Sequence, residues 1–168
     1  PASGRVAEFL APFADDLTPG TLEGYTLPVS DGSERNRANI GAALAQFETA
    51  GWTVQEGALK DADGKDFTFE ILLQVGATEP QAIIDMYVET LSRVGITPTV
   101  ATADSAQFKG RTDAFDFDMT YYRRGVSLSP GNEQYSYYGM ESVETVGGRN
   151  LMGVSSEAVD AMIGRLLT

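Results

Sequence analysis

Apolar residues recur every three to four positions in two long stretches of the chain. Ile40, Leu44 and Phe47 follow this spacing within residues 34–50, which begin after a serine and end before a glycine. The same period runs through residues 80–94, again with a glycine directly after it. This spacing places the apolar side chains on one face of a helix, and serine and glycine are common at its two ends. The pattern therefore predicts two amphipathic helices, 34–50 and 80–94.

Other stretches alternate apolar and polar residues instead. The clearest contains Phe67, Phe69, Ile71 and Leu73, which share one face of an extended chain. Strands are predicted at 52–56, 67–74, 96–102 and 115–121. Because the second and third of these flank the helix over 80–94, they should form a βαβ unit with parallel strands. Apolar residues between the alternating ones also suggest that strand 67–74 is covered on both sides.

The Asp63-Gly64 pair lies between two extended stretches, residues 59–61 and 65–75. An Asp-Gly pair in this position is a strong signal for a β-hairpin turn. The acidic residues around it also invite comparison with a calcium-binding loop, but the twelfth position of such a loop is Leu72 here, where an acidic ligand is required. We therefore predict a hairpin.

The remaining segments are mainly loops. Residues 1–32 are rich in proline, with a short helix at 7–10, and we treat them as a lead-in to a single domain over 33–168. Most of residues 123–154 lack periodicity, whereas residues after Ser155 resume a helical pattern. A short helix capped by Asp104 is also predicted. The fold class is α/β, with a mixed sheet and flanking helices.

Composition excludes several classes of function. The 168 residues carry a net charge of -12, which disfavours binding to nucleic acid. The chain has no cysteine and no histidine, so it has no disulfide, thiolate zinc site or histidine-based catalytic triad. No apolar run approaches the length that crosses a bilayer, so we expect no membrane insertion. We expect no cofactor and no bound metal.

Two motifs invite a catalytic or phosphate-binding interpretation. Asp116 and Asp118 share one face of the predicted strand 115–121, where two carboxylates could act as a hydrolase pair. The opposite face of that strand is apolar, so a solvated or hydrogen-bonding face is the alternative. The glycine-rich segment 147–150 lacks the spacing and lysine of a phosphate-binding loop, and a tight turn is predicted there.

A cluster of tyrosine, arginine and amide side chains follows strand 115–121. Tyrosine offers a large contact surface with a polar tip, and arginine pairs well with carboxylates. Ligands of open α/β sheets bind where strand ends meet loops. The residues alone leave two interpretations open, a ligand-contacting loop and a tyrosine-rich packing loop. The candidate ligand-binding residues are Tyr121, Tyr122, Arg123, Asn132, Glu133 and Tyr135.

Taken in order, several segments resemble the family 5 extracellular solute-binding proteins, which serve ABC importers of peptides. The resemblance covers residues 28–168, and its later segments are most similar to the oligopeptide and microcin C-type branch. The segments that carry it are Arg35-Asn36-Arg37, Ala50-Gly51-Trp52, Asp63-Gly64-Lys65, residues 69–73, residues 91–96, residues 115–118, Ser129-Pro130-Gly131-Asn132-Glu133-Gln134, Gly148-Arg149-Asn150 and Val159-Asp160.

The resemblance implies a protein of two lobes that close over a peptide or related solute and then dock on a membrane permease. Such proteins are exported, so a periplasmic or cell-surface location is implied, and they are not enzymes. The chain would be most of a C-terminal lobe, and we expect it to be a segment of a longer protein. Many relatives carry an aspartate that binds the peptide ammonium group in the loop after the strand equivalent to 115–121. This sequence has no acidic residue over 127–131, and Glu133 is the nearest carboxylate.

Overall fold

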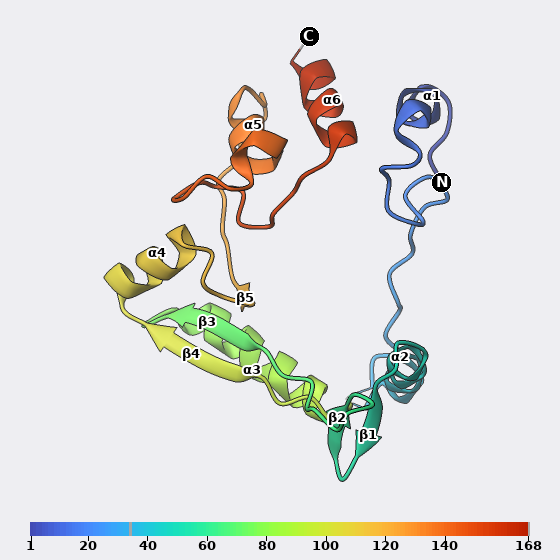
Figure 1. Ribbon diagram of the computed structural model, residues 1–168, viewed down its shortest axis with the longest axis vertical. Helices are drawn as coiled ribbons and strands as arrows, with labels where there is room; N and C mark the ends of the chain where they lie inside the picture. The colour runs from blue at the N-terminus through green and yellow to red at the C-terminus, as the bar shows by residue number, and fades with distance from the viewer. Residues whose placement is uncertain (34, 168) are drawn as a thin grey trace. The chain divides into compact units, whose positions relative to one another are not determined.

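The computed structural model describes residues 1–33 and 35–167, which form two compact units (Figure 1). The expected first residue of the first helix, Glu34, and the last residue of the chain, Thr168, lie outside the described residues. The predicted division between residues 1–32 and 33–168 stays a prediction. We call the two units the loop unit, residues 1–27, 112–115 and 123–168, and the sheet unit, residues 28–111 and 116–122.

A parallel sheet forms the centre of the sheet unit. Strand β3 (Glu70–Gln74) lies between β4 (Thr99–Ala103) and the short β5 (Met119–Thr120), and it runs parallel to both. The predicted parallel pairing of the second and third strands is therefore confirmed, although each strand begins three residues later than expected. The predicted α/β class is confirmed as well, with parallel and antiparallel pairs in separate sheets.

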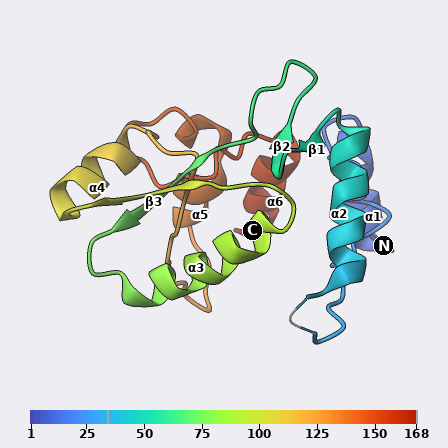
Figure 2. The same ribbon diagram turned by 90° about the horizontal axis from the view of Figure 1, so that it is seen from below.

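Helix α3 (Thr78–Ser92) connects β3 to β4 and runs along one face of this sheet (Figure 2). Its buried residue Ile84 packs in one cluster with Ile71 and Leu73 of β3. Leu72, which points to the other face of β3, is 0% exposed. The strand is thus covered on both sides, as its apolar sequence predicted.

Gly95 lies in the connection between α3 and the following strand. Its φ of +82° lies in the left-handed region, and a Cβ atom here would lie 2.7 Å from the backbone nitrogen of Leu59. The same Leu59 nitrogen donates a hydrogen bond to the Gly95 carbonyl oxygen at 2.8 Å. Only glycine satisfies both the backbone conformation and this close approach.

A second, antiparallel pair consists of β1 (Thr53–Gln55) and β2 (Ala58–Lys60). Glu56 and Gly57 connect them with positive φ values of 52° and 85°, the conformation of a tight two-residue hairpin turn. Strand β2 therefore takes β1 as its partner along its whole length. The sequence patterns did not predict this pairing.

The predicted hairpin around Asp63-Gly64 is confirmed over its short arm, where the Asp61 nitrogen donates to the Lys65 carbonyl oxygen at 3.0 Å and the Phe67 nitrogen to the Leu59 carbonyl oxygen at 2.8 Å. An isolated antiparallel bridge, Lys60 with Asp66, lies between these two bonds. The turn itself does form, because Asp61 Oδ1 accepts hydrogen bonds from the backbone nitrogens of Asp63 and Lys65 at 3.0 Å and 2.8 Å. This local bonding closes the turn without a long ladder, and residues 70–74 pair with β4 and β5 instead.

Helix α2 (Arg37–Thr49) confirms the first predicted helix and covers a second core. Its half-buried residues Ile40, Leu44 and Phe47 pack against a buried cluster of Leu59, Val94 and Ile96. None of its own residues is fully buried. The helix is therefore held by one half-covered apolar face.

Helix α4 (Ser105–Asp113) begins where predicted, since Asp104 Oδ1 accepts hydrogen bonds from the backbone nitrogens of Ala106 and Gln107, both at 2.9 Å. It extends well beyond the predicted short helix. Of the strand predicted over 115–121, the structure contains the two residues of β5. Phe115 adopts a left-handed φ of 54°, and the Asp116 nitrogen bonds back to the Arg111 carbonyl oxygen, so the chain turns before it can pair.

The loop unit contains only short helices. Helix α6 (Glu157–Leu166) confirms the predicted last helix, although Ser156 rather than Ser155 is its N-cap. The prediction of loop over most of 123–154 missed α5 (Glu133–Tyr138), whose six residues carry too few apolar positions to display a period. The helical elements are α1 (Arg5–Leu10), η1 (Ala11–Phe13), α5 (Glu133–Tyr138), η2 (Met140–Ser142) and α6 (Glu157–Leu166).

A buried asparagine organises the core of this unit. Asn150 is 0% exposed, and its amide both donates to the Val154 carbonyl oxygen at 2.8 Å and accepts from the Val154 nitrogen at 2.9 Å. Tyr137, Ala158 and Ile163 supply buried apolar side chains in the same unit. The tight turn predicted for the glycine-rich segment is present, since the Gly148 nitrogen donates to the Thr145 carbonyl oxygen at 2.7 Å, and Asn150 closes the next turn, over residues 150–154.

Candidate functional site

The six predicted ligand-binding residues are divided between the two units. Tyr121 and Tyr122 follow β5 in the sheet unit, whereas Arg123, Asn132, Glu133 and Tyr135 belong to the loop unit. Each group is therefore described within its own unit.

The two tyrosines of the sheet unit have different surroundings. Tyr121 packs against the Ile71 and Leu73 cluster, and its ring centroid lies 5.9 Å from that of Phe108. Tyr122 is 51% exposed. Tyr121 thus contributes to packing of the sheet. Tyr122 is the tyrosine of this pair whose side chain is accessible to a ligand.

Glu133 begins α5 and shapes the loop before it. Its Oε1 accepts hydrogen bonds from the Gly131 nitrogen at 2.9 Å and from Gln134 Nε2 at 3.1 Å. The Gly131 bond is the largest cause that holds the pKa of this carboxyl below its ordinary value. Glu133 therefore acts first as a brace of residues 131–134.

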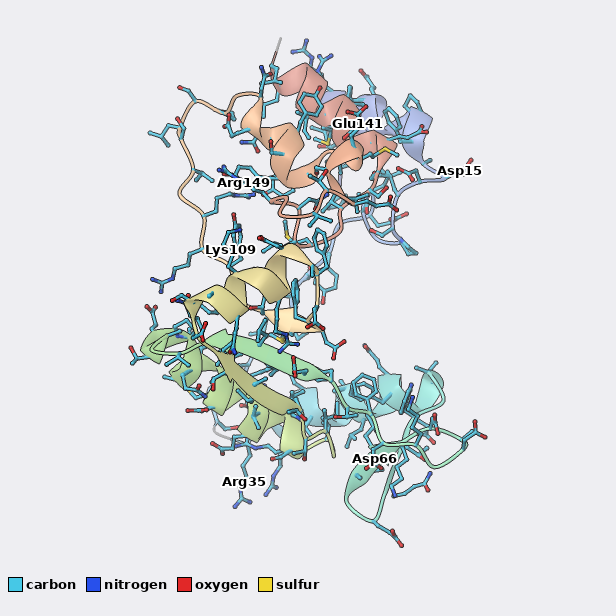
Figure 3. The ribbon with its side chains drawn as sticks, turned by 60° about the vertical axis from the view of Figure 1, so that its left-hand side comes forward. Asp15, Arg35, Asp66, Lys109, Glu141 and Arg149 are labelled. Atoms are coloured by element: carbon cyan, nitrogen blue, oxygen red, sulfur yellow. The ribbon has the colours of Figure 1, made fainter. Side chains whose placement is uncertain are left out.

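Asn132 and Tyr135 line a hollow of about 500 Å³ together with Gly139, Glu141 and Asp160. Figure 3 labels Glu141 within the loop unit. Asp160 Oδ1 already accepts a hydrogen bond from the Met140 nitrogen at 3.1 Å, which ties α6 to η2. With two carboxylates, an amide and a phenol at its wall, this hollow can accept hydrogen bonds from a polar or cationic group.

A cluster of aromatic and cationic side chains forms a second feature of the loop unit. The guanidinium of Arg124 lies over the rings of Tyr137 and Tyr138, 4.1 Å and 4.7 Å from their centroids, and donates a hydrogen bond to the Tyr138 hydroxyl. Arg149, labelled in Figure 3, donates to the Tyr137 hydroxyl at 3.1 Å. We call Arg124, Tyr137, Tyr138 and Arg149 the arginine–tyrosine cluster.

Sequence reasoning named Arg123 and missed this cluster. Adjacent arginines gave no reason to prefer Arg124, and Arg149 lies in a segment interpreted as a turn. The available signal was the Tyr137-Tyr138 pair, since arginine stacks readily on tyrosine rings. Which arginine would reach them depends on the path of the intervening loop.

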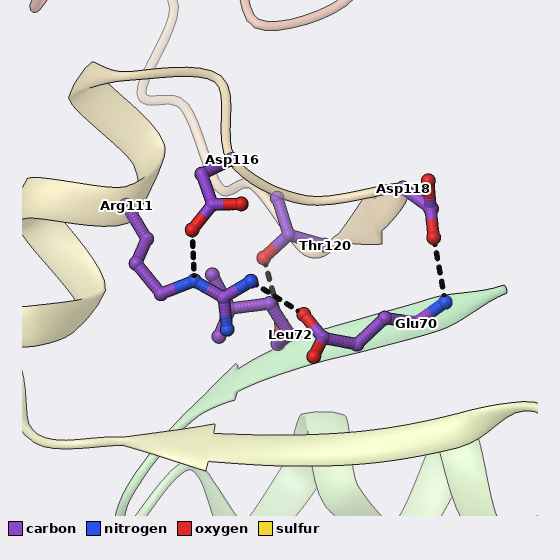
Figure 4. A network of polar contacts seen from close by, with 6 residues as sticks. All are labelled: Glu70, Leu72, Arg111, Asp116, Asp118 and Thr120. Carbon is purple, nitrogen blue, oxygen red and sulfur yellow. Dashed lines mark hydrogen bonds and ion pairs between the residues drawn. The ribbon is translucent and has the colours of Figure 1, made fainter.

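Asp116 and Asp118 make structural contacts in the sheet unit (Figure 4). Arg111 Nε donates to Asp116 Oδ2 at 2.8 Å, and its NH2 group donates to Glu70 Oε1 at 2.6 Å. Asp118 Oδ2 accepts from the Glu70 backbone nitrogen at 2.8 Å. The pKa of Arg111 is raised by its bond to Asp116 first and to Glu70 second. This arrangement fixes the segment around β5 to the start of β3.

Two further properties follow from the described residues. None of the helices within 1–33 and 35–167 is long and apolar enough to cross a membrane. Across the same residues, acidic side chains do not gather in groups of three that could hold a metal ion.

Comparison with known proteins gives relatives over almost the whole chain. A binding protein of Brucella melitensis biotype 1 is 38% identical over 168 residues, and a protein of Agrobacterium fabrum named as the peptide-binding protein YejA is 30% identical over 167 residues. The match covers 99% and 98% of this chain but 27% of each relative, so the chain spans about a quarter of their length. No family model matches the sequence.

The fold has a counterpart among solved structures. The oligopeptide-binding protein AppA from Bacillus subtilis, solved in complex with a nonapeptide, matches with a TM-score of 0.64 and 18% sequence identity. The match covers 95% of this chain and 32% of AppA. The chain is therefore similar in sequence to a segment of these binding proteins, and its fold matches part of an oligopeptide-binding protein.

Proposed function

We propose that the protein to which this chain belongs is the substrate-binding component of an ABC importer. It binds peptides or related solutes between two lobes and delivers them to a membrane permease. The chain is a segment of its C-terminal lobe, and the complete protein acts in the periplasm or at the cell surface. It binds and releases its ligand without chemical change.

The observation that carries this proposal is sequence identity of 30–38% to proteins named as binding proteins over nearly all of the chain. One of these relatives is named as peptide-binding, and the structurally similar AppA holds a nonapeptide. The loop unit adds chemistry suited to peptides, because it combines tyrosine, amide and carboxylate groups around one hollow.

The alternative of a carboxylate-dependent hydrolase finds little support in the geometry. Asp116 is paired with Arg111, and Asp118 accepts a backbone hydrogen bond from Glu70. A catalytic pair would need one carboxyl group with a raised pKa and access to substrate. The other alternative, an interaction domain without a small ligand, is an outcome of the binding experiment below.

We propose Tyr122, Arg123, Asn132, Glu133 and Tyr135 as ligand contacts, with Tyr121 supporting Tyr122 from the sheet. The first experiment purifies the complete protein from its own host and identifies bound molecules by mass spectrometry, followed by titration calorimetry with the peptides found. Co-purified peptides that rebind with micromolar affinity are expected. A protein that carries no peptide and binds none in calorimetry would exclude the proposal.

A second experiment tests Glu133. In the complete protein, Glu133→Gln removes the charge but keeps the size of the side chain. If Glu133 binds the ligand's ammonium group, this change weakens binding of free-amine peptides and spares N-acetylated ones. If it serves only as a brace of residues 131–134, both kinds of peptide lose affinity equally. Glu144→Gln, at an exposed carboxylate of the same unit that does not line the hollow, is the matched control and should leave both affinities unchanged.

A further inference from the structure

A hollow with a basic rim lies along one face of α2 in the sheet unit. Its volume is about 600 Å³, and the residues that line it are Arg35, Arg37, Ile40, Gly41, Leu44 and Arg93. The four lining residues that belong to α2 fall at i, i+3, i+4 and i+7 from Arg37, so they share one face of the helix. The hollow therefore combines an apolar floor with three guanidinium groups.

The charge at this hollow is opposite to that of the chain as a whole. The chain has 24 acidic and 12 basic residues, and three of the 12 line this hollow. Arg93 is paired with Glu89 at 3.0 Å. Arg35, labelled in Figure 3, and Arg37 are both exposed, and neither forms an ion pair within residues 1–33 and 35–167. Two guanidinium charges are therefore available to an anion from outside the chain.

Gly41 keeps the hollow open. A glycine in the interior of a helix weakens that helix relative to alanine, and a positive φ or a close neighbour is the usual reason for it. Gly41 has neither, because its φ is not positive and a Cβ atom here would meet nothing of the described chain within 4 Å beyond the backbone of its own helix. What the glycine provides is space beside the half-buried side chains of Ile40 and Leu44.

The size of the hollow favours a small molecule over a protein partner. Sites for small molecules enclose roughly 300–1,000 Å³ and are mainly apolar, with a few polar groups that fix the ligand. A stable protein interface uses about 20–30 residues on each side, whereas six residues line this hollow. An apolar floor beside guanidinium groups fits a molecule that joins an anionic head to an apolar chain.

We propose that this hollow binds an amphiphilic anion. The carboxylate or phosphate group of the ligand pairs with Arg35 and Arg37, because the guanidinium fork matches both kinds of oxyanion. The apolar chain of the ligand covers Ile40 and Leu44 and thereby removes their exposed apolar surface from water. The site lies wholly within the sheet unit and is additional to the proposed peptide binding. A free fatty acid and an anionic membrane lipid share this chemistry.

The first experiment titrates the complete protein with octanoate, below the concentration at which octanoate forms micelles, and measures binding by calorimetry. Two further probes separate the contributions, since acetate lacks the apolar chain and 1-octanol lacks the charge. Octanoate should bind about tenfold more tightly than either of them. Equal affinity for octanoate and 1-octanol would leave the arginines without a role and would overturn the proposal.

Variants localise the site. Gly41→Leu fills the hollow with a side chain and also favours the helix, so it should fold and should weaken octanoate binding at least tenfold. Gly110→Leu is the matched control, because Gly110 of α4 also has open space around it and no positive φ. Octanoate binding that survives Gly41→Leu would place the ligand elsewhere and contradict the proposal.

The charge is tested separately. The double variant Arg35→Gln, Arg37→Gln should weaken octanoate binding about tenfold and leave 1-octanol binding unchanged. Lys65→Gln, which removes an exposed cation of the same unit away from the hollow, is the control and should change neither. Equal losses for octanoate and 1-octanol in the double variant would reject the pairing of the head group with these arginines.

A second measurement distinguishes the two sources of the ligand. The complete protein is sedimented with vesicles of phosphatidylcholine that contain phosphatidylglycerol, an anionic lipid. Vesicle binding that is lost in Gly41→Leu would identify a membrane lipid as the ligand, and octanoate binding without vesicle binding would identify a free amphiphile. Either result would support the site even if no peptide bound to the protein. A protein that binds neither octanoate nor vesicles would exclude the site even if peptides bound well.

Discussion

The two units of this chain are stabilised by different kinds of interaction. In the sheet unit, Ile71, Leu72 and Leu73 are at most 1% exposed and lie at the centre of three paired strands. In the loop unit, buried apolar residues are joined by a buried polar one, Asn150, which is 0% exposed, and arginines stack on tyrosines. Apolar burial is non-directional, whereas hydrogen bonds and stacking require defined geometry. The sheet unit thus relies mainly on apolar burial, and the loop unit adds directional polar contacts to its apolar core.

The largest effect is expected from the apolar core. Ile71→Ala should lower the free energy of unfolding of the sheet unit by about 2–5 kcal/mol, because it removes buried methyl groups and leaves a cavity. Trp52, the single tryptophan of the chain, lies in this unit and reports its unfolding by fluorescence in urea. Val75→Ala is the control, since Val75 is 64% exposed. A loss as small as that of the control would mean that the core is not packed as described.

The corresponding change in the loop unit is Asn150→Ala. It leaves the nitrogen and carbonyl oxygen of Val154 without their buried partner and should cost about 1–3 kcal/mol. Faster amide hydrogen exchange over residues 137–163 is the expected readout, with the Trp52 transition unchanged. If the Trp52 transition shifts by the same amount, the two units unfold together and the contrast between them fails.

A smaller effect is expected where the sheet unit itself relies on charge. Arg111→Lys replaces a fork that reaches both Asp116 and Glu70 by a single ammonium group. The urea midpoint should fall, by less than for Ile71→Ala, because these side chains are partly exposed and water replaces much of the interaction. A drop as large as that of Ile71→Ala would show that polar contacts dominate this unit too.

The smallest effect concerns the pH dependence of the loop before α5. The pKa of Glu133 is lowered in the folded chain, so the ionised carboxylate stabilises the fold at pH values above the ordinary pKa of 4.5. This stabilisation is lost as the pH falls through the lowered pKa of the folded chain. The amide resonance of Gly131 should therefore titrate below pH 4.5, and it should not titrate in Glu133→Gln. Residues of β3 serve as the internal reference. A Gly131 titration at or above the ordinary pKa of glutamate would contradict the hydrogen bond between Gly131 and Glu133.

Residue patterns predicted most of the sheet unit. The helical period over 80–94 and the alternation around Ile71 correctly indicated α3, β3, β4 and their parallel pairing. These elements have strong periodic signals because each has one buried face, and a βαβ connection leaves few arrangements. The resemblance then indicated the fold of the lobe, which AppA matches.

The same reasoning was incomplete where two turns lie close together. It predicted the Asp63-Gly64 turn, whose arms do bond over 59–61 and 65–67, but it missed the Glu56-Gly57 turn that pairs β2 with β1. Likewise, alternation over 115–121 favoured a strand that begins at Phe115, whereas the left-handed φ of Phe115 turns the chain and pairing begins at Met119. A period shows which side chains share a face, but it does not show which segment the backbone will pair with.

The sequence by itself determined the fold class, the main helices and strands, and the candidate window of tyrosines and arginines. Tertiary structure decided which of these side chains meet: Arg124 lies over Tyr137, and Arg149 joins from a turn 25 residues further along the chain. Periodic burial is encoded locally, since it depends on neighbours three or four positions away. Contacts between loops depend on the path of the backbone between them, and that path is set only when buried groups such as Asn150 find their hydrogen-bond partners.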